Sequence, residues 1–244
     1  MEHIAALDNQ DAYGARPFEI SGNVPIPDYL QQTYWWAYLH PNAVRLFERQ
    51  WLVNLILWGN YAPLRDAALE EMGATIEGRA LQVACVYGDF SERVASRLGR
   101  NGRLDVVDVA PVQLENLSTK VRDARVSLHH QDSTDLAFDD GTYDHVVVFF
   151  LLHEQPVEAR IRTIGEALRV TRPGGRVIFV DYHRPEIFNP LRYVMVPILR
   201  TLEPFAMELW RRDIIASVPE DRHPQAYGKE TYFGGLYQKV VLTR

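Results

Sequence analysis

LQVACVYGDFSERVASRL, residues 81–98, joins an apolar run to a helical pattern through a short turn that contains Gly88. In nucleotide-binding folds, the turn between the first strand and the first helix lies against the cofactor and is rich in glycine. Here only Gly88 remains of the glycines that such a turn uses. The stretch therefore predicts the scaffold of a cofactor site whose first loop has been rewritten.

Short apolar runs alternate with helical patterns after Gly78. This alternation is typical of a doubly wound, Rossmann-like α/β fold with a mostly parallel sheet. Residues 171–176, TRPGGR, predict a type II turn, and residues 231–244 predict a C-terminal antiparallel hairpin that closes the sheet. The expected strands cover 80–86, 103–109, 125–132, 143–152 and 176–182, and the expected helices cover 91–99, 111–123 and 156–170.

The N-terminal part of the chain lacks this alternation. Residues 1–30 carry Asn, Asp, Gly and Pro without a period and predict an irregular arm or lid. Apolar residues at helical spacing predict one helix over 42–58, and Pro63 and Gly73 bound a second helix. We therefore expect an N-terminal arm and helical cap over 1–75, which contributes to the substrate pocket. A cofactor-binding Rossmann-like domain follows over 76–244, with a helical insertion over 184–218.

The composition excludes several classes of protein. The 244 residues carry a formal net charge of -6, which gives no general electrostatic reason to bind nucleic acid. Cys85 is the only cysteine, so an internal disulfide and a thiolate metal cage are impossible. The N-terminus lacks the pattern of a secretory signal. The apolar run from Val146 to Leu152 is far shorter than the roughly 20 residues of a membrane-spanning helix.

Polar residues that follow the expected strands are the candidate cofactor ligands, because ligands gather at the carboxyl ends of parallel strands. Asp108 ends the second strand and lies at the separation from Gly88 that suits a carboxylate gripping ribose hydroxyls. Gln131 and Asp132 follow the third strand, where a carboxylate can accept from an adenine amino group. Asp108 can instead be a solvated strand end, and Asp132 a helix N-cap.

Four motifs resemble those of class I S-adenosylmethionine-dependent methyltransferases that act on quinone precursors. They are LQVACVYGDFS, LDVVDVAP, HHQDSTDLAF and ALRVTRPGGRVIFVDY. Gln82, Ala84 and Val86 depart from the family, which has an acidic residue and two glycines at these places. The resemblance implies the methyltransferase fold and a site for S-adenosylmethionine. The implied cofactor-binding residues are Gln82, Ala84, Val86, Tyr87, Gly88, Asp108, Val109, Asp132 and Ser133.

A narrower resemblance, to the family of rhodoquinone biosynthesis enzymes, covers most of the chain. This resemblance is carried by Gln82, Ala84 and Val86 together with three longer motifs, YWWAYLHPNAVRLFERQWLVNLILWGNY, FFLLHEQP and KETYFGGLYQKVV. It implies conversion of ubiquinone to rhodoquinone by replacement of a ring methoxy group with an amino group, with S-adenosylmethionine as the amino donor and Mn2+ as the metal. A quinone or phenol methyltransferase and a non-catalytic module that binds S-adenosylmethionine and a quinone are the alternatives.

Candidate metal ligands lie at the carboxyl ends of the fourth and fifth expected strands. His153, Glu154, Asp181 and His183 combine imidazole with carboxylate, which suits Mn2+ and a substrate oxygen. Each also has a structural interpretation, such as a helix cap or a hydrogen bond to a neighbouring side chain. We expect Tyr87, His153, Glu154 and Asp181 to be the catalytic residues.

Aromatic and apolar residues are the candidates for contact with the quinone and its membrane. Stacking on a flat ring is expected of Tyr34, Trp35, Tyr38, Trp51 and Tyr182, although an aromatic run can equally be core. Residues 184–212 combine many apolar residues with five arginines and three glutamates, a local charge of +2 (5 minus 3). This pattern suits a peripheral position on an anionic membrane or packing on the sheet or a second subunit. From the substrate, we expect the cytoplasmic face of the bacterial inner membrane, or the matrix side of a mitochondrion.

Overall fold

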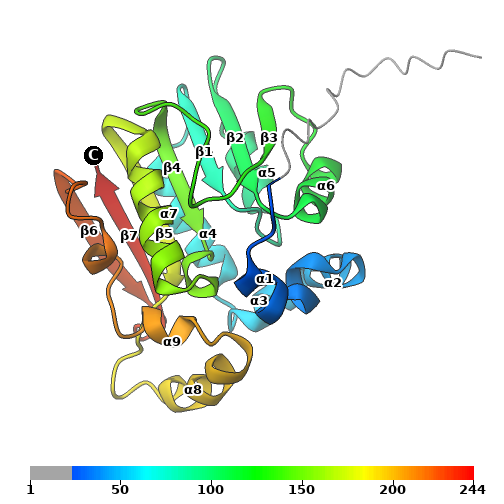
Figure 1. Ribbon diagram of the computed structural model, residues 1–244, viewed down its shortest axis with the longest axis vertical. Helices are drawn as coiled ribbons and strands as arrows, with labels where there is room; N and C mark the ends of the chain where they lie inside the picture. The colour runs from blue at the N-terminus through cyan, green and yellow to red at the C-terminus, as the bar shows by residue number, and fades with distance from the viewer. Residues whose placement is uncertain (1–23) are drawn as a thin grey trace, which may run out of the picture.

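The structure is a computed structural model that describes residues 24–244. It contains a seven-stranded sheet in the order β3-β2-β1-β4-β5-β7-β6 (Figure 1). Strands β1 to β5 pair in parallel with one another. Strand β7 pairs antiparallel with both β5 and β6. The strands are β1 Arg79–Val83, β2 Arg103–Asp108, β3 Val126–His130, β4 Tyr143–Phe149, β5 Thr171–Tyr182, β6 Ala226–Tyr232 and β7 Tyr237–Thr243. The predicted mostly parallel sheet with a terminal hairpin is confirmed.

Helices cover both faces of this sheet, with α7 in front and α4 and α5 behind it in the view of Figure 1. They alternate with the strands as the sequence predicts. Their bounds are α4 Tyr61–Met72, α5 Phe90–Ser96, α6 Pro111–Lys120 and α7 Val157–Val170.

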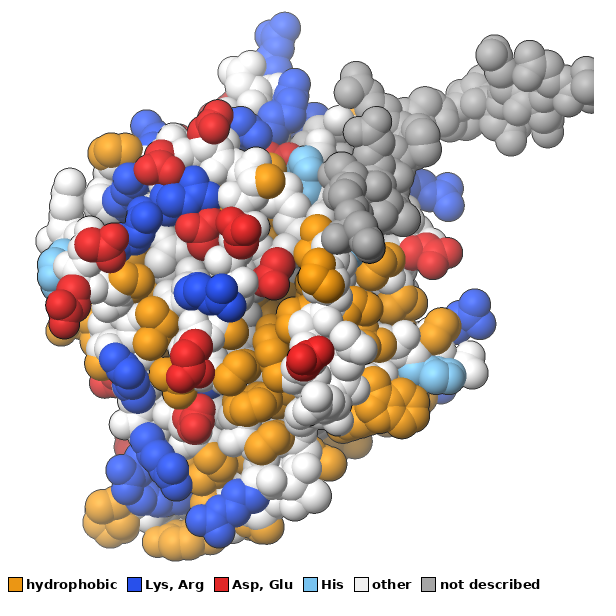
Figure 2. All heavy atoms as spheres, viewed as in Figure 1, with side chains coloured by type: hydrophobic (Ala, Val, Ile, Leu, Met, Phe, Trp, Pro, Cys, Tyr) orange, Lys and Arg blue, Asp and Glu red, His pale blue; other side chains and the backbone are white. Residues whose placement is uncertain are grey.

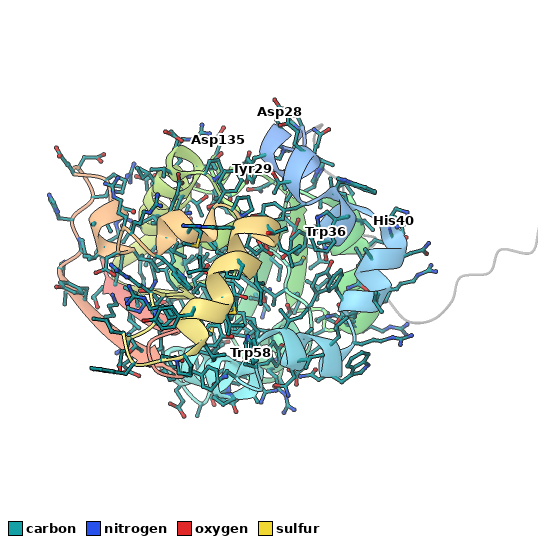
Figure 3. The ribbon with its side chains drawn as sticks, turned by 90° about the horizontal axis from the view of Figure 1, so that it is seen from below. Asp28, Tyr29, Trp36, His40, Trp58 and Asp135 are labelled. Atoms are coloured by element: carbon teal, nitrogen blue, oxygen red, sulfur yellow. The ribbon has the colours of Figure 1, made fainter. Side chains whose placement is uncertain are left out.

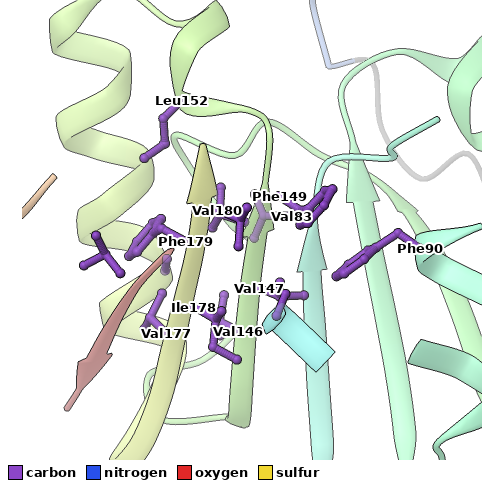
Figure 4. Packing of buried hydrophobic residues seen from close by; sticks show 14 of the residues in the cluster. Val83, Phe90, Val146, Val147, Phe149, Leu152, Val177, Ile178, Phe179 and Val180 are labelled. Carbon is purple, nitrogen blue, oxygen red and sulfur yellow. The ribbon is translucent and has the colours of Figure 1, made fainter. Parts of the chain in front are cut away.

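The core lies where β1, β4 and β5 meet the helices (Figure 4). Val146, Val147 and Phe149 of β4 are fully buried, because both faces of this central strand are covered. Phe149 stacks on Phe90 of α5, with ring centroids 4.4 Å apart. This contact fixes the start of α5, and with it the turn that follows β1.

The N-terminal elements form a cap at the carboxyl ends of the parallel strands (Figure 1). The cap consists of α1 Asp28–Thr33, a π-helix Trp35–Leu39, α2 Pro41–Phe47 and α3 Gln50–Ile56. The prediction of one helix over 42–58 is wrong, because the chain breaks between α2 and α3, where Glu48 turns inward. The predicted irregular arm lies mostly outside the described residues, and its end, from Asp28, is helical.

One further prediction differs from the structure. Residues 171–176 belong to β5, although Gly174 has the positive φ of 77° that the expected type II turn requires. The segment that follows β5 forms two helices, α8 Leu191–Leu202 and α9 Ala206–Leu209, and a 3-10 turn, Ile215–Ser217. Trp210, one of the apolar residues in the segment 184–212, is buried, as the packing alternative for that segment requires at this position. Within residues 24–244, no helix has the length and apolar character to cross a bilayer.

Arg160 ties the insertion to the domain. Its side chain on α7 is buried and donates hydrogen bonds to the carbonyl oxygens of Leu152 (2.9 Å), Gln155 (2.9 Å) and Phe205 (3.0 Å). Burial lowers the pKa of the guanidinium group. The Arg160 side chain thus holds together two elements, the 3-10 helix Leu152–Glu154 after β4 and the start of α9.

Candidate cofactor site

A pocket lies at the carboxyl ends of β1, β2 and β4, where a doubly wound sheet is expected to bind its ligand. The cap closes it from the other side, because Tyr29 and Leu30 of α1 and Tyr38 of the π-helix contribute to its wall. The remaining lining residues are Ala84, Cys85, Val107, Asp108, Val109, Ala110, Gln113, Gln131, Asp132, Ser133, Phe150, Leu151 and Glu154. The structure thus brings together Ala84, Asp108, Val109, Asp132 and Ser133 of the predicted cofactor residues, with Tyr38 and Glu154.

Gln82, in β1, lies two residues before the pocket residue Ala84 and is fully buried. Its Nε2 donates to the carbonyl oxygen of Ala84 at 3.0 Å, and its Oε1 has no hydrogen-bond partner. Ala84 has a φ of 71°, a left-handed conformation that favours glycine. The rewritten loop therefore keeps the backbone shape of a glycine-rich turn and leaves one buried acceptor free.

Asp108 closes the pocket from the end of β2. Its carboxylate accepts from the backbone N–H of Cys85 at 2.7 Å and of Ala110 at 2.8 Å, so both oxygens are fixed in place. Burial raises the pKa of Asp108 to about 6, although these two N–H groups counteract the rise. Above this pH the group is a rigid carboxylate with lone pairs left for a hydroxyl donor.

The residues after β3 form the second wall. Asp132 accepts from the backbone N–H of Thr134 at 2.8 Å, so it caps a turn rather than a helix. Ser133 Oγ lies 3.0 Å from Thr163 Oγ1 and accepts from Gln155 Nε2 at 3.0 Å. These contacts hold the wall to α7.

Tyr87, predicted as a cofactor and catalytic residue, does not line the pocket. Its hydroxyl donates to the carbonyl oxygen of Ala37 at 2.6 Å and accepts from Gln113 Nε2 at 2.9 Å. Its ring stacks on that of Tyr38, with centroids 5.8 Å apart. Burial raises the pKa of Tyr87, so it stays a phenol and fastens the cap to the first loop.

Glu48 fastens the cap at a second point. Its carboxylate accepts from the backbone N–H of Gly88 at 3.2 Å, from Lys120 Nζ at 2.6 Å and from Asn116 Nδ2 at 2.7 Å. Lys120 also donates to the carbonyl oxygen of Gly88 at 2.8 Å. Because Glu48 faces this network, the helix expected over 42–58 ends before it.

A group of buried ionisable residues adjoins the pocket. Glu154 belongs to both, and burial raises its pKa to about 8. His153 Nδ1 lies 2.9 Å from Asp181 Oδ1, an ion-pair contact too oblique for a hydrogen bond. Burial lowers the pKa of His153, but the negative charge of Asp181 outweighs it and raises the pKa to about 9. Glu203 is a further acid whose pKa is raised by burial.

The predicted metal ligands are not assembled as a metal site. His183 lies apart from the other three, with its Nδ1 2.8 Å from the carbonyl oxygen of Gly235. Asp181 accepts from the backbone N–H of Tyr182 at 2.6 Å and pairs with His153. In the described part of the chain, no three His, Cys, Asp or Glu side chains are grouped so that they could hold a metal ion.

The predicted substrate aromatics separate into three groups, of which only Tyr38 lines the pocket. Tyr34 and Tyr182 are buried, Tyr34 against Phe205 and Tyr182 against His153. Trp35 and Trp51 are 54% and 60% exposed and do not line the pocket. Sequence reasoning missed Tyr29, Leu30, Gln113, Phe150 and Leu151, because only the folded cap and the ends of β2 and β4 reveal them.

Gly88→Ala tests the first loop. Gly88 has a φ of 85°, and an added Cβ would lie 2.6 Å from Tyr61 Oη. We expect the change to lower the free energy of unfolding by about 2–4 kcal/mol, from backbone strain and overpacking together. Gly59→Ala is the matched control, because Gly59 has a φ of 78° and nothing within 4 Å of the added atom. Equal losses of stability in urea unfolding would show that the contact with Tyr61 does not matter.

Comparison with known proteins relates the chain to methyltransferases. Residues 80–175 match the family described as methyltransferase domain. The demethylmenaquinone methyltransferase of Bacillus subtilis is 28% identical over 139 residues, which cover 56% of this chain and 59% of that protein. That of Staphylococcus aureus is 28% identical over 147 residues, 60% of this chain and 59% of that protein. The chain thus spans less than two thirds of the length of these relatives.

Solved structures give the same fold. A SAM-dependent methyltransferase from Aquifex aeolicus superposes with a TM-score of 0.55 at 16% identity, over 84% of this chain and 98% of that one. Phosphoethanolamine N-methyltransferase 2 from Haemonchus contortus, in complex with S-adenosyl-L-methionine, gives a TM-score of 0.58 at 14% identity, over 91% and 60%. The predicted Rossmann-like methyltransferase fold is therefore confirmed.

Proposed function

We propose, for a chain that carries a methyltransferase domain over residues 80–175, that it binds S-adenosylmethionine and modifies a lipid quinone. The reaction that we propose is that of the rhodoquinone biosynthesis protein RquA, the conversion of ubiquinone to rhodoquinone by replacement of a ring methoxy group with an amino group. The sequence resemblance and the quinone-methylating relatives support the substrate class.

The residues of the pocket fit S-adenosylmethionine. The fixed carboxylate of Asp108 would accept from ribose hydroxyls, and Asp132 and Ser133 would face the adenine. The free Oε1 of Gln82 is an orphaned buried acceptor beside the loop, and such a group calls for a donor. When bound, S-adenosylmethionine would supply the nitrogen that replaces the methoxy group: the methoxy group would leave as methanol, and the bond between that nitrogen and the α-carbon of the cofactor would break, so that the rest of the cofactor leaves as a co-product.

The presence of glutamine at position 82, in place of an acidic residue, is the single observation that favours amination over methylation. A carboxamide offers an acceptor but no negative charge, so it cannot hold an ammonium group as firmly as a carboxylate does. An amine that is held less firmly as a cation loses its proton more easily and becomes a nucleophile.

Manganese does not fit the residues predicted to bind it. His183 lies apart, and Asp181 is engaged by His153 and a backbone N–H. No step of the proposed reaction therefore depends on a metal ion. Instead, Glu154, whose pKa is raised to about 8, is protonated near neutral pH and lies in the pocket, where it can donate a proton to a quinone carbonyl.

Gln82→Glu tests the role of the missing charge. The variant keeps the shape of the side chain but provides a carboxylate, and we expect the rate of amination to fall at least about tenfold. Gln82→Met removes the amide without adding charge and is the control. Amination by Gln82→Glu at the wild-type rate, measured under saturating cofactor, would contradict the proposed role of the carboxamide.

The proposed reaction is tested by mass spectrometry of a short-tail ubiquinone incubated with the protein and S-adenosylmethionine that carries heavy nitrogen at its amino group, with and without Mn2+. Heavy nitrogen in the quinone together with loss of methoxy would support amination. A product that gains a methyl group would instead support the second candidate, a quinone methyltransferase, which the relatives favour. Cofactor binding without any product would indicate a non-catalytic binding module.

The site of action follows from the substrate. Ubiquinone is dissolved in a membrane, so we place the protein at the cytoplasmic face of a bacterial inner membrane or on the matrix side of a mitochondrion. Fractionation of cells that produce the protein tests this placement. Recovery in the soluble fraction alone at low salt would contradict it.

A further inference from the structure

Large hydrophobic side chains are exposed in two segments of the cap and the insertion. Phe188 is 95% exposed, Ile187 67% and Leu55 66%. Apart from Tyr227 and Phe233 of the terminal hairpin, the exposed large hydrophobic residues among those described form what we term the apolar end. Its members are Trp35, Trp36, Leu46, Trp51, Leu55, Ile56, Trp58, Ile187, Phe188, Tyr193, Val194, Ile198 and Leu202.

Both segments lie at the same end of the molecule. In Figure 1, α3 and α8 are at the lower end, beyond the carboxyl ends of the parallel strands. The view from below faces α8, the cap helices and Trp58 together (Figure 3). The π-helix, which carries Trp35 and Trp36 of the apolar end, also contributes Tyr38 to the wall of the cofactor pocket. The apolar end is thus next to the site.

The sequence of α8 is not explained by packing on the protein. Met195 and Leu199 are buried against the core, as one apolar face requires. Val194, Ile198 and Leu202 follow one another at intervals of four residues and are exposed, so α8 has a second apolar face. A surface helix normally carries polar residues there, and an extended exposed apolar patch indicates an interaction site.

The charges around the apolar end are positive, although the chain as a whole is acidic. Residues 184–212 contain five arginines and three glutamates, and Glu203 is one whose pKa is raised by burial. Arg184, Arg200, Arg211 and Arg212 are exposed. Figure 2 shows Lys and Arg side chains beside hydrophobic ones at the lower end of this face. Exposed Trp, apolar side chains and Arg together suit the interface of an anionic bilayer.

We propose that the apolar end is a docking surface for an anionic lipid bilayer, with Phe188 and the exposed face of α8 inserted among the headgroups and the arginines against lipid phosphates. The inference rests on the proposed function for the identity of the lipid-soluble substrate, but the surface itself is argued from exposure and charge. Docking in this orientation turns the cap and the pocket toward the membrane that holds a quinone.

The test is co-sedimentation of the full chain with vesicles of equimolar phosphatidylglycerol and phosphatidylcholine that contain no quinone. We expect binding that weakens in high salt and on phosphatidylcholine alone. The variant Phe188→Glu/Ile198→Glu is expected to lower the partition coefficient at least about tenfold, and Leu55→Glu is expected to lower it as well. Tyr227→Glu is the matched control, because Tyr227 is 61% exposed but pairs with Leu242 of β7, which in turn pairs with Val177 in the amino-terminal half of β5, away from the carboxyl ends of the strands.

The readout does not depend on turnover, so failure of the amination assay leaves this result standing, and the reverse also holds. Wild-type protein that stays in the supernatant, or a double variant that binds as well as wild type, would overturn the proposal.

Sedimentation velocity on the same samples tests the competing occupant of this surface, a second copy of the chain. A dimer that the double variant converts to a monomer, without vesicle binding, would assign the surface to a second copy of this chain. Circular dichroism shows whether the variants are folded.

Discussion

Asp108→Asn is expected to weaken the binding of S-adenosylhomocysteine by between about 10-fold and 100-fold at pH 7.5, because hydrogen bonds to a charged carboxylate contribute roughly 1.5–3 kcal/mol. The carboxylate is held by the N–H groups of Cys85 and Ala110, so its lone pairs point in fixed directions. An amide cannot accept from both N–H groups and still offer an oxygen to a hydroxyl. Isothermal titration calorimetry measures the loss.

The pH dependence of binding sharpens this prediction. Burial raises the pKa of Asp108 to about 6 in the free protein. Below that pH the group gains a proton and loses acceptor capacity, so affinity is expected to fall as the pH is lowered from 7.5 to 5. In Asp108→Asn this part of the pH dependence should disappear. A variant with the same pH profile as the wild type would show that another group is responsible.

Asp105→Asn is the matched control. Asp105 lies on the same strand and is also buried, but its carboxylate accepts from Arg79, Tyr143 and His129 and does not line the pocket. Its replacement is expected to reduce stability and to leave the affinity for S-adenosylhomocysteine nearly unchanged. Equal losses of affinity in both variants would indicate a general effect on β2.

Arg160→Leu is expected to lower the free energy of unfolding by about 3–5 kcal/mol. Three carbonyl oxygens, of Leu152, Gln155 and Phe205, would lose their donor at a place where water is excluded. Arg162→Leu is the control, because Arg162 lies on the same helix and is exposed, and its replacement should change stability by less than about 0.5 kcal/mol. Urea unfolding followed by circular dichroism measures both values.

Arg160→Leu should also affect the pocket. Phe205, whose carbonyl oxygen Arg160 holds, packs against Tyr29 and Tyr34 of the cap with ring centroids 6.2 and 6.4 Å apart. We expect weaker cofactor binding even at temperatures where the variant is fully folded. Unchanged binding in the folded variant would show that the cap holds its position without the insertion.

Strong periodic patterns allowed the fold to be predicted from the sequence. The apolar run of β4 and the glycine hairpin before β7 have only one reasonable structural interpretation, and both elements form as expected. The prediction of one helix over 42–58 was wrong for a reason that the periodicity of the sequence cannot show. Glu48 forms hydrogen bonds with Gly88, Asn116 and Lys120, which are distant in sequence, and these bonds interrupt the helix.

The site was predictable where it depends on strand ends. Asp108 and Asp132 could be located because the carboxyl ends of parallel strands meet at one edge, and both line the pocket. Tyr29, Leu30 and Gln113 could not, since their place depends on how the cap lies over the sheet. The sequence left open whether Trp210 packs inward, because an apolar residue in an arginine-rich segment suits both a membrane surface and the core, and the structure buries it.

The contact between Tyr29 and Phe205 has a consequence for the order of events during synthesis. Tyr29 is among the first described residues to leave the ribosome, whereas Phe205 follows the five parallel strands and α8. The cap therefore has no complete surface to dock on until most of the chain has emerged. Its apolar residues remain exposed to water until then. We expect premature termination after β5 to yield chains that depend on chaperones, although the five parallel strands are already present.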